Sequence, residues 1–204
     1  MKKMSALDRV LLLVTGLLAA YQIVVGIDSF DTLPILAYTV AFGVLLVAGL
    51  LLIIFGFEVL SSPLVVIVAA IIPLGLSLGL VAQYRPALTM LYAAFAFVGL
   101  TAIAVTRLVA PGRVGTIVLA VVHGIAGLVI FGLPILFSLQ GKTPMGFALV
   151  GVGGALIGLG GLLLAFLKAG KPILSQNIIL AVLPGLLLLT TAAFVAGFAA
   201  APLR

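Results

Sequence analysis

The stretch that decides the fold is Leu33–Phe57, LPILAYTVAFGVLLVAGLLLIIFGF, which runs without a single charged side chain. An α-helix needs about 20 apolar residues to cross the hydrocarbon core of a bilayer, which is about 30 Å thick. We therefore predict that this stretch is a membrane-spanning helix, with length to spare for a tilt or a kink.

Six further apolar runs of similar length accompany this one, and short polar segments separate them. Most of these segments contain proline, which is tolerated in the first turn of a helix because its missing N–H would be unpaired there anyway. The fold class predicted is all-α, a polytopic bundle in one domain (1–204). Its seven transmembrane spans are 10–27, 33–57, 63–83, 86–107, 114–139, 144–167 and 172–202.

Composition agrees with lipid as the main solvent. Of 204 residues, 65% are apolar and 7% are charged, whereas soluble domains carry about 25% charged residues. The net charge of +6 comes from Lys and Arg scattered between apolar runs, so we do not expect nucleic acid binding. Because the chain has no cysteine, disulfides and thiolate metal sites are excluded.

The basic residues also predict an orientation, because Lys and Arg in short loops favour the cytoplasmic side. With the N-terminus inside, seven basic residues lie inside and three outside. The inner set is Lys2, Lys3, Arg9, Arg107, Arg113, Lys168 and Lys171, and the outer set is Arg85, Lys142 and Arg204. We therefore expect N-in and C-out, in the cytoplasmic (inner) membrane of a prokaryote. The first run is interpreted as a retained span, with a cleaved signal peptide as the alternative.

A weak internal repeat relates the first three spans to the last three. Arg9-Val10 and Arg113-Val114 open the first and fifth spans, and Ile72-Pro73 and Leu183-Pro184 interrupt the third and seventh. The hypothesis is a 3+1+3 arrangement of parallel repeats with the fourth span as a connector. The alternative is chance alignment of stretches rich in leucine, glycine and valine.

His123 is the most distinctive residue, because it lies near the middle of the fifth span where no carboxylate is expected. Burial without a partner disfavours the charged imidazolium, so we expect a neutral imidazole. A neutral imidazole can ligate a haem- or chlorophyll-type tetrapyrrole, whereas a protein zinc site needs more ligands than one histidine provides. The competing interpretation is a structural hydrogen bond to a neighbouring helix. We predict no metal site.

Acids and prolines supply the other candidates. Glu58 follows the second span near the cytoplasmic edge, where it could bind a cation or relay a proton. The favoured interpretation is that it reaches the headgroups or pairs with Lys168 or Lys171. Candidate helix breaks lie at Pro73, Pro134 and Pro184.

Glycine is placed at spacings that favour close helix contact. Gly75 and Gly79 form a small-xxx-small pair in the third span. A second set, in the sixth span, shares one helix face and consists of Gly151, Gly154, Gly158 and Gly161. We predict that both sets pack against other helices.

These features leave three functional classes. The first is a non-enzymatic accessory or structural subunit of a larger membrane complex, whose partners are membrane lipids and other subunits or further copies of the chain. The second is a small-solute transporter or channel, and the third is a pigment- or haem-binding electron-transfer subunit that uses His123. An enzyme is disfavoured, because no acid–base pair and no activated nucleophile is visible.

Overall fold

The computed structural model describes residues 3–26, 31–109, 112–168 and 173–201. All regular secondary structure in these ranges is helical. Seven of the helical stretches are long and apolar enough to cross a membrane, so the predicted spans are confirmed. The helices are α1 (Ala6–Val25), α2 (Thr32–Phe55), η1 (Gly56–Ser61), α3 (Pro63–Ala69), α4 (Ile71–Tyr84), η2 (Pro86–Leu88), α5 (Thr89–Leu108), α6 (Arg113–Leu139), η3 (Met145–Phe147), α7 (Ala148–Lys168) and α8 (Gln176–Ala199).

Polar capping residues set the starts of the first and last spans, which therefore differ from the starts predicted from the apolar runs. The backbone N–H of Asp8 donates to Ser5 Oγ at 3.1 Å, and the N–H of Ser5 donates to Asp8 Oδ2 at 2.8 Å. This reciprocal capping box starts α1 four residues before the predicted limit at Val10. Likewise, Ser175 Oγ accepts the N–H of Ile178 at 3.4 Å, so that α8 starts at Gln176.

The third span consists of two helices, because the α-helix ends at Ala69 and starts again at Ile71. Pro73 accounts for the break, since it has no N–H to donate and its ring would clash with the carbonyl four residues earlier, that of Ala69. On the other side of Pro73, Ser77 Oγ donates to the carbonyl of Pro73 at 2.6 Å.

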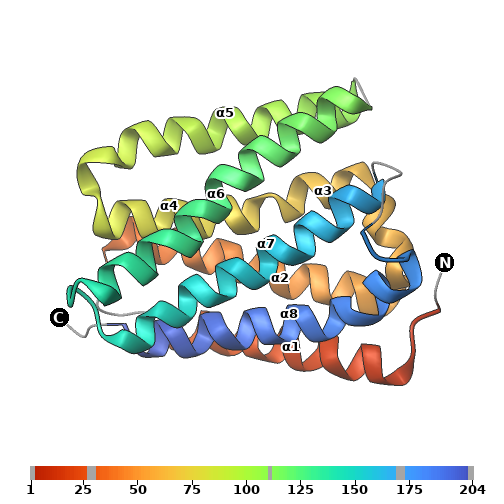
Figure 1. Ribbon diagram of the computed structural model, residues 1–204, viewed down its shortest axis with the longest axis horizontal. Helices are drawn as coiled ribbons and strands as arrows, with labels where there is room; N and C mark the ends of the chain where they lie inside the picture. Colours follow the sequence, from red (N-terminus) through yellow and green to blue (C-terminus); the bar gives the residue numbers. More distant parts are fainter. Residues whose placement is uncertain (1–2, 27–30, 110–111, 169–172, 202–204) are drawn as a thin grey trace.

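Six of the seven spans form a closed ring. In ring order they are α1, α2, the α3/α4 span, α6, α7 and α8, and α8 packs back against α1. The remaining span, α5, lies outside the ring against α3, α4 and α6 (Figure 1). Consecutive spans are neighbours throughout, as expected from the short connections. The helix α1 begins at the end of the bundle opposite to that at which α8 ends.

Aromatic side chains from three parts of the chain fill the ring. Phe42 of α2 meets Phe194 and Phe198 of α8, with ring centroids 6.4 and 6.0 Å apart. Phe147 of η3 lies 6.1 Å from Phe198, and Tyr38 lies 4.7 Å from the same ring. All five side chains are buried, so the centre of the ring is a packed core.

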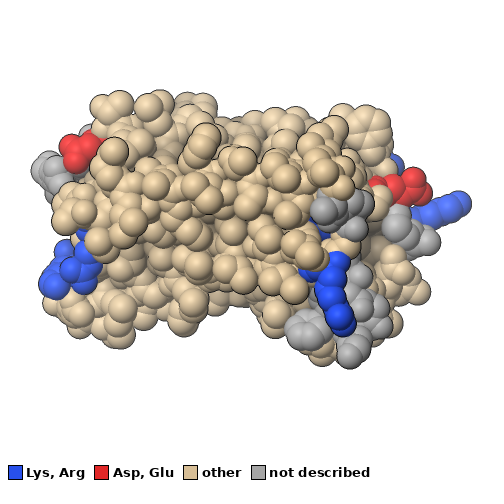
Figure 2. All heavy atoms as spheres, turned by 90° about the horizontal axis from the view of Figure 1, so that it is seen from above, with Lys and Arg blue, Asp and Glu red and all other residues tan. Residues whose placement is uncertain are grey.

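Charged side chains lie at the two ends of the bundle. In the face shown in Figure 2, Lys, Arg, Asp and Glu gather at both ends, and the broad band between them contains none. Large apolar side chains are exposed on this bundle, among them Val24, Phe97 and Leu128, at 84%, 74% and 71%. Such a surface is compatible with an integral membrane protein, because lipid covers the exposed band.

The glycine face of α7 is packed over only half of its length. A Cβ added at Gly154 would lie 2.8 Å from Ile130 Cγ2 and 2.9 Å from the backbone nitrogen of Phe131, both on α6. Gly151 is as tightly placed, against Phe131 and Ile135. In contrast, a Cβ at Gly158 would meet nothing within 4 Å.

This difference gives a prediction within one helix. We expect Gly154→Ala to lower stability by about 1–3 kcal/mol, because α6 and α7 would have to move apart. The matched control, Gly158→Ala, should leave stability unchanged or slightly raised, because alanine is the better helix former. Thermal unfolding of both purified variants in detergent measures the effects. Equal unfolding temperatures would show that α6 and α7 are not in close contact at Gly154.

Candidate functional sites

His123 lies in the first half of α6 with a partly buried side chain. Its Nδ1 is buried and has no hydrogen-bond partner among the described residues. The backbone carbonyl of Leu119, one turn earlier on α6, interacts with the imidazole but is not in hydrogen-bond geometry with Nδ1. Nδ1 therefore makes no hydrogen bond to a neighbouring helix among the described residues, and the two interpretations of His123 stay predictions.

The surroundings of His123 leave space on one side. A Cβ added at Gly124 or Gly127 would meet nothing within 4 Å. The open side would admit a flat ligand against the imidazole at these glycines. Within those residues, no group of three or more His, Asp or Glu side chains could hold a metal ion.

The buried hydroxyl groups bond mainly within their own helices. Thr15 donates to the carbonyl of Leu11 at 2.8 Å, and Thr191 donates to that of Leu187 at 2.9 Å. Two places depart from this pattern. Ser138 Oγ lies 3.0 Å from Thr143 Oγ1 and donates to the carbonyl of Pro144 at 3.1 Å, beyond the end of α6, and Thr190 Oγ1 is buried without a partner in the described part of the chain. These hydroxyls therefore do not converge on a shared polar cavity.

Glu58 is exposed at the end of the bundle, in η1. Its backbone carbonyl accepts a hydrogen bond from Ser61 Oγ at 2.6 Å. The predicted pairing with Lys168 or Lys171 concerns side chains that lie outside the described ones.

The three prolines have different consequences for their helices. Pro73 follows the break at Ala70, whereas α6 and α8 continue as helices through Pro134 and Pro184. All three prolines are buried.

The two predicted glycine sets are also placed differently. Gly75 and Gly79 of α4 both face α2, where an added Cβ at Gly75 would lie 2.9 Å from the carbonyl oxygen of Ala37 and one at Gly79 would meet the ring of Tyr38. In α7, Gly151 and Gly154 face α6, whereas Gly158 and Gly161 are exposed.

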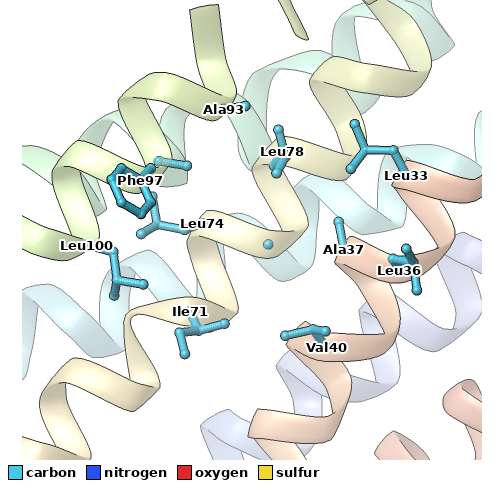
Figure 3. A pocket seen from close by; sticks show the side chains of 12 residues that line it. Leu33, Leu36, Ala37, Val40, Ile71, Leu74, Leu78, Ala93, Phe97 and Leu100 are labelled. Atoms are coloured by element: carbon cyan, nitrogen blue, oxygen red, sulfur yellow. The ribbon is translucent and has the colours of Figure 1, made fainter. Parts of the chain in front are cut away.

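An open groove of ≈ 360 Å³ lies between α2 and α5, with α4 as its floor (Figure 3). Its walls are aliphatic apart from Phe97, and the side chains of Val40, Leu74 and Leu100 point toward it. With no polar side chain in its lining, the groove fits an apolar body and offers no group for chemistry.

The outer end in the predicted orientation carries a cation–aromatic cluster that sequence reasoning missed. Arg85 and Lys142 approach the ring of Phe137, at 5.3 and 5.2 Å from its centroid, and Tyr84 stacks on the same ring at 5.4 Å. Both cations lie next to predicted span ends, which indicated that they share an end of the bundle. Their separation in the sequence did not indicate that they contact the same ring. Such contacts stabilise the loop ends by about 0.5–1 kcal/mol each at exposed sites.

No protein-family model, curated protein or solved structure matches the chain. Candidate functions therefore depend on the geometry above.

The position of His123 supports a prediction about its role. We expect His123→Gln to fold with an unfolding temperature close to that of the parent chain, because the imidazole makes no hydrogen bond that the amide must replace. Any chromophore that co-purifies should be retained, as measured by visible absorption. Loss of an absorption band in this variant, with the fold intact, would instead favour a tetrapyrrole bound to His123.

Proposed function

We propose that this chain is a non-enzymatic integral membrane protein that serves as an accessory or structural subunit of a larger membrane complex. The observation that carries this proposal is the packed centre of the ring, where Phe42, Phe147, Phe194 and Phe198 meet. Catalysis and ion coupling need polar groups with tuned pKa values in mutual reach. In this ring the interior is used for aromatic packing, and most buried hydroxyls bond within their helices.

A small-solute transporter is the second candidate, and the ring arrangement favours it. In the ring, the first, second and third spans are followed in the same order by the fifth, sixth and seventh. Turning the ring by half a turn therefore places each of the first three spans on its counterpart, which is the relation that the 3+1+3 repeat requires. Transporters with parallel repeats bind solute where the repeats meet, beside broken helices. The break before Pro73 supports this candidate, and the aromatic core that closes the interface between repeats opposes it.

We further propose that the chain lies in the inner membrane of a prokaryote with its N-terminus in the cytoplasm. Support comes from the described basic residues, since the end where α1 begins has Lys3, Arg9, Arg107 and Arg113, and the other end has Arg85 and Lys142. It also comes from Tyr38, Tyr84 and Tyr92, which lie in the halves of their spans nearer the other end, where amphipathic rings suit the interface.

Reconstitution tests the subunit role. The purified chain, alone in liposomes, should give no saturable flux of ions, sugars or amino acids. Native mass spectrometry of gently extracted membranes should find the chain with another membrane protein at constant stoichiometry. Saturable flux that is lost on Gly75→Leu, beside the break at Pro73, would replace the subunit role with transport. Gly43→Leu serves as the control, since an added Cβ at Gly43 meets nothing within 4 Å.

Single cysteines test the orientation, and the cysteine-free chain makes them unambiguous. Ser61 and Gln140 are exposed at opposite ends of the bundle. On intact cells, an impermeant thiol reagent should label Gln140→Cys and leave Ser61→Cys unlabelled until the membrane is opened. The reverse pattern would mean that the N-terminus faces outward.

A further inference from the structure

Among the described residues, two buried side-chain nitrogens without hydrogen-bond partners lie on neighbouring helices. Arg107 is in the last turn of α5, and its Nε is buried without a hydrogen-bond partner among the described residues. Nδ1 of His123, on α6, is in the same condition. A polar atom without a hydrogen-bond partner raises the free energy of the folded protein in a membrane, because the hydrocarbon layer holds no water that could pair with it.

The packing of α5 against α6 sets the relative height of these two residues. A Cβ added at Gly115 of α6 would lie 3.2 Å from the carbonyl oxygen of Thr106 on α5. A Cβ added at Gly99 of α5 would lie 3.0 Å from Val122 Cγ1 on α6. The helices are thus antiparallel, with Arg107 level with the start of α6. At about 1.5 Å per residue, His123 lies about 12 Å deeper than Gly115.

The direction of helical side chains closes most of this distance. Side chains tilt toward the N-terminus of their own helix. For Arg107 that direction leads into the membrane band, and for His123 it leads toward the end where Arg107 lies. The two side chains therefore point toward one another along the bundle axis.

The described part of the chain offers this guanidinium no acid. Glu58 lies at the same end of the bundle but is exposed and forms no ion pair with Arg107 in the described residues. The carbonyl end of the α5 dipole favours a cation there, which accounts for the position of the charge but leaves Nε unpaired. An anion from outside the chain, at the depth of the lipid headgroups, would supply the missing partner.

We propose that Arg107 and His123 form a binding site for an anionic glycerophospholipid. The guanidinium of Arg107 holds the phosphodiester through two parallel N–H donors, a geometry in which arginine is stronger than lysine. The imidazole of His123, placed deeper, donates an N–H to an ester carbonyl of the glycerol backbone. Space for an acyl chain lies beside Gly124 and Gly127, where no other residue approaches. This site does not depend on the proposed subunit role.

Lipid retention measures the site directly, and Arg113 provides a matched control because it is an exposed arginine at the start of α6. The full chain is purified in mild detergent and titrated with phosphatidylglycerol, phosphatidylcholine or inorganic phosphate, followed by native mass spectrometry. We expect one retained phosphatidylglycerol. Arg107→Gln should weaken its binding about tenfold or more, which is the loss of one charge-assisted contact. Arg113→Gln should leave the binding within about twofold of the parent chain, since Arg113 lacks the geometry of the site.

Two further variants keep the test decisive. Arg107→Lys retains the charge and should fold, with weaker retention than the parent chain because the planar donor pair is lost. His123→Leu should weaken phosphatidylglycerol binding and leave any binding of inorganic phosphate unchanged. Equal losses in Arg107→Gln and Arg113→Gln, or full retention in Arg107→Lys and His123→Leu, would overturn the site. Binding of inorganic phosphate as tight as that of the lipid would show a free-anion site and overturn the lipid assignment.

Discussion

The absence of water from the hydrocarbon layer is the constraint on which the rest of this structure depends. Every backbone N–H and C=O in that layer must find a partner inside the protein, and the described spans meet this demand as helices. At the break in the third span the backbone of Ala70 also stays paired: its N–H donates to the carbonyl of Val66 at 3.1 Å, and its carbonyl accepts the N–H of Leu74 at 3.4 Å. Pro73 has no N–H to donate to the carbonyl of Ala69, and the fully buried Ala70 lies beside this carbonyl, away from lipid.

The same constraint decides how the interior is used. A hydroxyl in lipid must bond somewhere, and the nearest acceptor is the carbonyl one turn back on its own helix, as Thr15 and Thr191 show. Hydroxyls that are used in this way contribute little to binding a solute. Helix-to-helix contact in the ring then depends on shape. Aromatic rings fill the wide centre, and glycines such as Gly75 and Gly154 let the backbones approach at the edges.

The number and type of the elements could be predicted from sequence because apolar run length is a one-dimensional property. Their ends could not, because local caps set them: Ser5 and Asp8 extend α1 into residues that look polar. The glycine face of α7 shows a different limit. Spacing places Gly151, Gly154, Gly158 and Gly161 on one side of the helix, but whether a neighbour is there depends on how far α6 stays alongside. How far two helices stay side by side is a property of the tertiary structure. The other half of α6 packs against α5, so it does not cover Gly158 and Gly161.

Besides α4, the helix α6 contacts α7 along one half and α5 along the other, and this division also explains why the polar candidates lie where they do. Its second half, around Ile130, packs against α7, and its first half, around Val122, packs against α5, which lies outside the ring. A helix that changes partner along its length cannot be enclosed on all sides, so one face of its first half remains open. His123 lies in that half and Arg107 lies on the helix packed against it. The sequence alone placed His123 at mid-depth but could not show that the helix packed against it carries an arginine with no acidic partner among the described residues.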